Sequence, residues 1–159
     1  MKWKRSSVRE GPAINMFVLV RILIGLVFVV SGAEKLVWPY QNFLYVIQGY
    51  QLLPSGLDEA VAHIFPWIEF LLGLFMVLGF WLPVTLRGVL TVLTTFILIV
   101  SQAIVRKLPL GECGCFGQLI SFPLPVIVVM DSVFFALTFL AFLNLKKTEA
   151  FSLDGYFQK

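Results

Sequence analysis

Four apolar runs, each long enough to cross a bilayer as a single helix, constrain this chain more than any other feature of its sequence. A helix needs roughly 20 residues to cross the hydrocarbon core, because each residue advances about 1.5 Å. The runs predict membrane-spanning helices over residues 14–37, 60–81, 84–105 and 124–145. A soluble domain would need polar side chains over its outside, whereas 59% of the residues are hydrophobic and 13% are charged. We therefore expect an all-α integral membrane protein, a four-transmembrane-helix bundle that forms a single membrane domain over residues 1–159.

The connections between these runs predict two further features. Only a tight turn around Pro83 separates the second run from the third, so these two helices should be antiparallel neighbours in a hairpin. In the first outer loop, apolar residues recur at helical spacing before Pro54 ends the pattern. These residues are Phe43, Val46, Ile47 and Tyr50. We expect a short interfacial helix there, lying on the outer surface of the membrane.

Basic residues predict the orientation of the bundle, because Lys and Arg are retained on the cytoplasmic side. Four crossings place both termini on one side. That side would hold Lys2, Lys4, Arg5, Arg9, Arg87, Lys146, Lys147 and Lys159. The opposite side would hold only Lys35, Arg106 and Lys107. We expect a multi-pass protein of the bacterial inner membrane with both termini cytoplasmic and the loop 106–123 periplasmic. The net charge of +3 follows from this topology and does not indicate nucleic-acid binding.

The periplasmic loop contains the only two cysteines of the chain, Cys113 and Cys115, separated by Gly114. A disulfide between residues two apart closes a very small ring, which a glycine in the middle permits because it lacks a Cβ. Such a bond should be strained, and strain raises its reduction potential. The pair therefore predicts a redox-active site more than a permanent cross-link, which would add little stability over so short a loop.

Other interpretations of the cysteine pair remain open. The nearby cation of Arg106 would favour the thiolate, whereas the adjacent Glu112 would oppose it. A metal site is a weaker hypothesis, because two thiolates need further ligands and the only histidine, His63, is better explained as an interfacial residue. Inert packing of the two cysteines is the third interpretation.

Two acidic residues, Glu69 and Asp131, fall inside the predicted helices at roughly the same depth, about 12 Å from the outer end. An acid at this depth should face the bundle interior, be protonated or find a partner. The first helix offers a partner, because Lys35 can bend its ammonium group towards Glu69. On the same stripe, Gly25 and Gly32 would permit close helix approach. The third helix presents further polar residues at compatible spacing, Thr91, Thr95 and Gln102.

These polar residues have two interpretations. Glu69, Lys35 and Asp131 support chemistry at the cysteine pair, through proton relay or quinone binding. Alternatively, they hold the helices in register and take no part in a reaction.

Several separated motifs resemble one family, the MauE branch of the MauE/DoxX redox-associated membrane proteins. The matching pieces are Arg21-Ile-Leu-Ile-Gly25, Phe28-Val-Val-Ser-Gly-Ala-Glu-Lys-Leu36, Tyr50-Gln-Leu-Leu-Pro54, Phe65-Pro-Trp-Ile-Glu-Phe-Leu-Leu-Gly-Leu74 and Cys113-Gly-Cys-Phe-Gly117. Met130 and Asp131 depart from the Arg-Asn pair common at that place in the family. The resemblance implies a four-helix bundle that takes part in periplasmic thiol–disulfide chemistry beside a thioredoxin-like partner.

The leading functional prediction is a membrane component of thiol–disulfide exchange, a possible oxidoreductase in which Cys113 and Cys115 react with a thioredoxin-like periplasmic protein. Electrons would move to or from a membrane quinone. If the relay needs a second cysteine pair, another membrane subunit must supply it. The alternative is a non-enzymatic assembly or maturation factor for a periplasmic or membrane protein, and a weaker alternative is a metal-handling protein.

Overall fold

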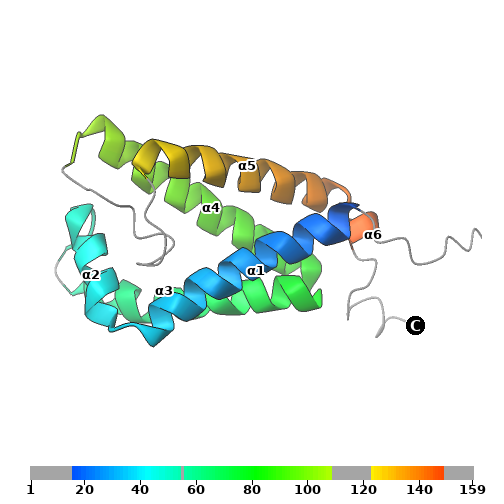
Figure 1. Ribbon diagram of the computed structural model, residues 1–159, viewed down its shortest axis with the longest axis horizontal. Helices are drawn as coiled ribbons and strands as arrows, with labels where there is room; N and C mark the ends of the chain where they lie inside the picture. Colours follow the sequence, from blue (N-terminus) through cyan, green and yellow to red (C-terminus); the bar gives the residue numbers. More distant parts are fainter. Residues whose placement is uncertain (1–15, 55, 109–122, 149–159) are drawn as a thin grey trace, which may run out of the picture.

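The computed structural model describes residues 16–54, 56–108 and 123–148, and within these ranges all regular structure is α-helical (Figure 1). Four helices are long and apolar enough to span a membrane: α1 (Met16–Val37), α3 (Leu57–Leu78), α4 (Leu82–Val105) and α5 (Leu124–Leu143). Two short helices accompany them, α2 (Tyr40–Gly49) and α6 (Leu145–Thr148). The predicted fold class, a four-helix membrane bundle with a short helix in the first loop, is confirmed.

Helix α3 ends at Leu78, three residues before the predicted end of the second membrane-spanning helix at residue 81. Gly79 ends α3 because it adopts a left-handed conformation with φ 69° and ψ 40°, and its amide donates to the carbonyl of Phe75. Trp81 is also left-handed, with φ 46°, and α4 begins at the next residue with Pro83 in its first turn. Sequence periodicity does not report these backbone angles, which explains the shift.

Helix α1 packs against α3 along a line of glycines, as the stripe on α1 predicts. A Cβ placed on Gly32 would lie 2.6 Å from the amide nitrogen of Phe70, and one on Gly73 would lie 2.6 Å from the amide nitrogen of Val29. Gly25 likewise faces the backbone of Val77 at 3.0 Å. The two helix backbones therefore approach more closely than any larger residue would allow.

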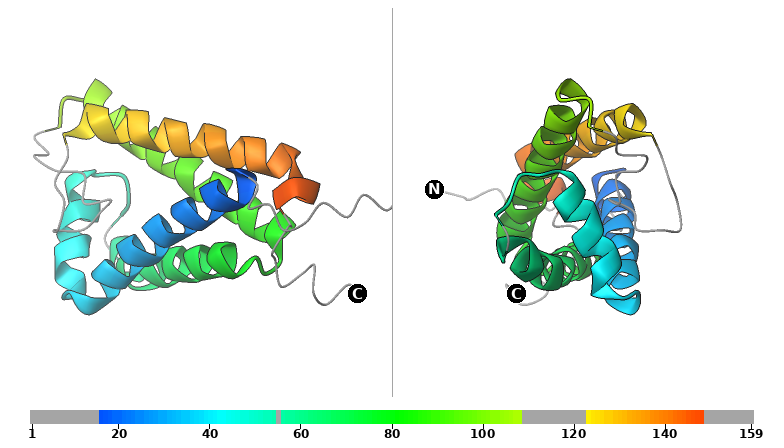
Figure 2. Two further views of the ribbon diagram at one scale, coloured as in Figure 1. Left: turned by 45° about the vertical axis from the view of Figure 1, so that its right-hand side comes forward. Right: turned by 90° about the vertical axis from the view of Figure 1, so that its left-hand side faces the viewer.

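Helices α3 and α4 form the predicted antiparallel hairpin, in which they contact each other near their shared turn. Each packs mainly on another helix, α3 on α1 and α4 on α5. Near the turn, Gly88 on α4 lets Leu72 of α3 come close. Further along, the two helices diverge towards the end of the bundle that carries α2, as Figure 2 shows. This divergence leaves a pocket between α3 and α4.

The two ends of the bundle are distinct (Figure 1). The start of α1 and the short α6 lie at one end, where the Arg21 guanidinium donates to the carbonyl of Thr148 at 2.9 Å. At the other end, which we call the α2 end, Tyr50 packs against Val100 of α4 and Leu124 of α5. The end of α4 and the start of α5 therefore both lie at the α2 end.

Apolar side chains are exposed along the outer surface of every long helix. Examples are Leu23, Trp67, Leu98 and Val129. In a helix bundle of this composition such residues contact lipid, since the hydrocarbon region offers no partner for polar groups.

Candidate functional site

A buried ion pair joins α1 to α3 in the half of the bundle nearest α2. The ammonium Nζ of Lys35 lies 2.7 Å from Oε2 of Glu69, and the two side chains are only 1% and 4% exposed. The contact that the sequence predicts between these residues is therefore present. Two charges so well shielded from water interact strongly, and each compensates for the lost solvation of the other.

Ser31 completes this ion pair and was not predicted from the sequence. Its hydroxyl donates to Oε1 of Glu69 at 3.0 Å and accepts a hydrogen bond from Nζ of Lys35 at 2.9 Å. Both carboxylate oxygens of Glu69 are thus hydrogen-bonded. A signal was available, because Ser31 lies four residues before Lys35 and so on the same face of α1. We call Ser31, Lys35 and Glu69 the polar cluster.

Two aromatic rings lie close to the ammonium group of Lys35. Its Nζ lies 5.4 Å from the ring centre of Phe43 on α2 and 5.9 Å from that of Phe96 on α4. A cation over an aromatic face is attracted by the electrons of the ring, most strongly where water is excluded. The two rings therefore stabilise the cation.

Asp131 of α5 faces the polar cluster across a small cavity. This cavity, of about 20 Å³, is lined by Ser31, Glu69, Phe96 and Asp131 among others. Asp131 is 5% exposed, and its Oδ2 has no hydrogen-bond partner among the described residues. The cavity has room for about one water molecule. Two carboxyl groups and a single ammonium group thus share this part of the interior.

The sequence predicts that polar residues of α4 contribute to this polar site. The structure does not bring them into the polar cluster. The hydroxyls of Thr91 and Thr95 donate to the backbone carbonyls of Arg87 and Thr91, each four residues earlier, and both threonines are exposed. Their own helix satisfies them. Gln102 is partly buried, and its Oε1 has no hydrogen-bond partner within the described ranges.

A larger pocket, of about 330 Å³, lies where α3 and α4 diverge and α2 covers the opening. We call it the apolar pocket. Its lining consists of Phe43, Val46, Ile47, Tyr50, Leu52, Leu53, Val61, Phe65, Thr95, Phe96, Ile99 and Val100. Among these described lining residues, Tyr50 and Thr95 are the only ones with a polar side-chain group. Phe96 lines both the apolar pocket and the small cavity beside Asp131, so the two spaces are neighbours.

Tyr50 links the apolar pocket to Asp131 electrostatically. Burial, with a smaller contribution from the charge of Asp131, raises the pKa of Tyr50 to about 12. Both causes disfavour the phenolate, because a buried anion loses hydration and is repelled by a neighbouring carboxylate. The phenol therefore keeps its proton at neutral pH.

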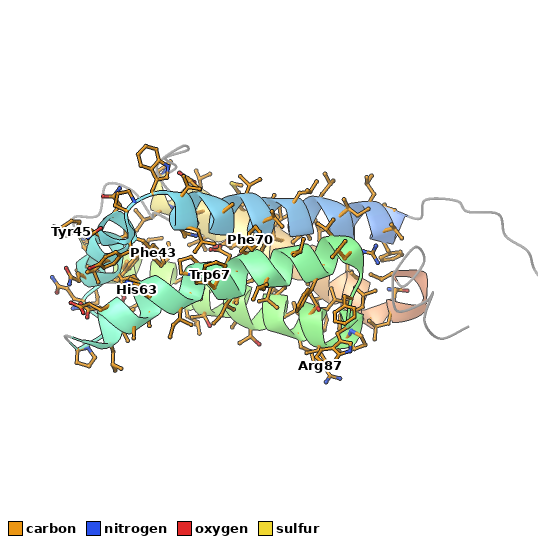
Figure 3. All side chains as sticks on the ribbon, turned by 90° about the horizontal axis from the view of Figure 1, so that it is seen from below. Phe43, Tyr45, His63, Trp67, Phe70 and Arg87 are labelled. Atoms are coloured by element: carbon orange, nitrogen blue, oxygen red, sulfur yellow. The ribbon has the colours of Figure 1, made fainter. Side chains whose placement is uncertain are left out.

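Helix α2 is held over the apolar pocket by polar contacts with the start of α3. The side-chain amide of Gln48 donates to Oδ2 of Asp58 at 2.7 Å. Oδ1 of Asp58 accepts hydrogen bonds from the amides of Gly56 and Glu59. Figure 3 shows Phe43 and His63 together at this end of the molecule. The ring of His63 lies 4.2 Å from that of Tyr40, and its Nδ1 lies 2.9 Å from the carbonyl oxygen of Glu59.

The predicted redox pair, Cys113 and Cys115, lies outside the described residues, so its geometry stays a prediction. Arg106 is described and is an exposed residue directly after α4. His63 is exposed, and no group of three potential metal-ligating side chains occurs in the described part of the chain.

The structure defines a multi-pass α-helical membrane protein with a buried ion pair and an apolar pocket at one end. The family model described as "Methylamine utilisation protein MauE" matches residues 14–144, and the chain belongs to this family. The chain is also similar to a protein of Flavobacterium psychrophilum named Protein TlpB, with 31% identity over 140 residues. That alignment covers 81% of this chain but only 37% of the relative, so the chain spans little more than a third of it. No solved structure matches the chain.

Proposed function

We propose that this protein is a membrane component of thiol–disulfide exchange in which Cys113 and Cys115 react with a thioredoxin-like periplasmic protein. The observation that carries the proposal is an arrangement at one end of the bundle. The segment with both cysteines connects the end of α4 to the start of α5, and both of these lie at the α2 end. The polar cluster and Asp131 lie in the same half of the bundle.

The chemistry of the exchange is balanced within the two proteins. When the Cys113–Cys115 pair is oxidised, a thiolate of the partner attacks one sulfur and a mixed disulfide forms. The second thiolate of the partner then breaks the mixed disulfide. The partner leaves as a disulfide, and the membrane protein is left with two thiols. The same steps in reverse would reduce the partner, and the relative reduction potentials decide the direction.

The described residues support this chemistry in two ways. Arg106 places an exposed cation at the end of α4, and a nearby cation lowers the energy of a thiolate. Glu69, Lys35 and Asp131 place ionisable groups in an apolar interior, where such groups are costly and generally functional. In the bacterial inner membrane, with both termini in the cytoplasm, the cysteine segment would face the periplasm, where disulfides persist.

A trapping experiment tests the proposal. In the direction in which the membrane protein reduces its partner, Cys113 of the Cys115→Ser variant attacks the partner's disulfide. The mixed disulfide should then accumulate, because Cys115, the thiol that would release it, is missing. We expect a conjugate on non-reducing gels that disappears with dithiothreitol. The matched controls are Cys113→Ser, which exposes the other cysteine, and the double serine variant, which should trap nothing. If neither single variant yields a conjugate, thiol exchange through this pair is refuted.

A non-enzymatic assembly factor is the second candidate, and one observation favours it. The polar cluster is fully hydrogen-bonded between α1 and α3, which is what a purely structural role requires. Under this hypothesis the double serine variant would still support accumulation of the client protein. Loss of the client in that variant would exclude it.

A further inference from the structure

The apolar pocket has the properties of a ligand site for which the thiol exchange itself provides no role. At about 330 Å³ it falls within the range of small-molecule sites. It is formed by α2, α3 and α4 near the α2 end, and its almost entirely apolar lining suits a ligand that partitions into lipid. We propose that this pocket binds the ring of a membrane-soluble quinone, and the electron-transfer part of this proposal rests on the proposed function.

The aromatic lining favours a planar ring over a saturated chain. Phe43, Phe65 and Phe96 come from three different helices and form one continuous aromatic wall. The Phe43 and Phe65 rings are stacked at 6.3 Å, and the Phe65 and Phe96 rings meet edge to face at 5.4 Å. A planar ring gains stacking energy against such a wall, whereas an acyl chain gains only contact area.

The ionisable groups beside the pocket favour a ligand that takes up protons. Phe43 and Phe96 have the Lys35 ammonium group close to their faces, and Lys35 is paired with Glu69, so an ion pair without net charge lies behind these rings. Phe96 also borders the cavity that contains Asp131, whose carboxyl group could exchange protons with a quinone during its reduction. A lipid chain would make no use of this carboxyl group.

The electron balance closes with the cysteine pair. Oxidation of the Cys113–Cys115 dithiol to a disulfide forms one S–S bond and releases two electrons and two protons. Reduction of a quinone to its hydroquinone consumes two electrons and two protons and converts both carbonyls to hydroxyls. The reverse reaction would reduce the disulfide at the expense of a hydroquinone. No further oxidant or reductant is needed.

Photolabelling of the full chain in lipid nanodiscs tests the pocket. A short-chain azidoquinone should label peptides from α2 and α4, including those with Phe43 and Phe96. The Val61→Trp variant fills the pocket from α3 and should reduce labelling at least tenfold. Val129→Trp, on the exposed face of α5, is the matched control and should change labelling less than twofold.

A milder variant and a competitor keep the test decisive. Phe65→Leu preserves apolar volume but removes one ring, so it should weaken quinone labelling several-fold even where Val61→Trp fails to fold. Decyl-ubiquinone should compete with the label, whereas decanol, which has the chain without the ring, should not. Competition by decanol as strong as that by decyl-ubiquinone would show an acyl-chain groove and overturn the proposal. Labelling outside the pocket, or labelling unchanged in Val61→Trp, would also overturn it.

The two proposals can fail separately. Quinone labelling does not require the cysteines, so the double serine variant should be labelled like the native chain. Labelling of the pocket without any trapped conjugate would refute the thiol-exchange proposal and support the quinone site. A trapped conjugate without labelling would refute the quinone site and support the thiol exchange.

Discussion

The buried ion pair offers a quantitative test of how the bundle tolerates charge in its interior. In the Lys35→Met variant, Glu69 keeps the hydrogen bond from Ser31 but loses the cation 2.7 Å away. Both side chains are almost fully shielded, so no discount for solvent screening applies. Removing one partner of a buried pair typically costs about 3–5 kcal/mol, because the remaining charge is uncompensated.

Two effects reduce this figure in a membrane protein. The unfolded state within a bilayer or micelle also finds polar partners, so its acid is not wholly unpaired. The residual serine hydrogen bond retains about 1 kcal/mol. We therefore expect Lys35→Met to lower the free energy of unfolding by about 2–3 kcal/mol. The double variant Lys35→Met/Glu69→Gln should recover most of this loss, because neither position then holds an unpaired charge.

The assay is reversible unfolding in mixed micelles with increasing dodecyl sulfate, read by circular dichroism. The single variants, the double variant and the native chain form a cycle that isolates the interaction energy between the two residues. Lys107→Met removes an exposed cation and is the matched control, with an expected change below about 0.5 kcal/mol. An interaction energy below about 0.5 kcal/mol would refute the reasoning, since a surface pair would give as much.

Two further predictions concern packing and ionisation. Gly32→Ala should cost about 1–3 kcal/mol in the same assay, because its Cβ would meet the backbone of Phe70 at 2.6 Å, which cannot yield. Gly88→Ala is its control and should be nearly neutral, since its Cβ meets only the flexible end of Leu72; equal losses would refute the close-packing argument. In an ultraviolet titration, Tyr50 should ionise near its raised pKa of about 12, and stability should fall as pH rises from about 10 towards that value, because the unfolded phenol ionises first. Asp131→Asn should lower the pKa of Tyr50; an unchanged titration would show that the two groups are not coupled.

Local patterns predicted much of the fold. The four spans depend on the length of each apolar run, and α2 depends on the helical recurrence of Phe43, Val46, Ile47 and Tyr50. The pairing of Lys35 with Glu69 was also predictable, because an unpaired acid at the depth of Glu69 is costly and the long side chain of Lys35 can reach it. Similarly, Gly25 and Gly32 lie on one stripe, and small residues on a stripe indicate a close helix contact.

The tertiary structure alone decided what surrounds these residues. Whether Asp131 faces Glu69 depends on the rotation of α5 about its axis, which its almost uniformly apolar sequence does not indicate. The apolar pocket exists because α3 packs on α1 while α4 packs on α5, so two helices joined by a tight turn diverge. Which helices pair depends on the relative stabilities of interfaces between residues that are far apart in the sequence. Periodicity reports which face of one helix is apolar, and it contains no information about which neighbour covers that face.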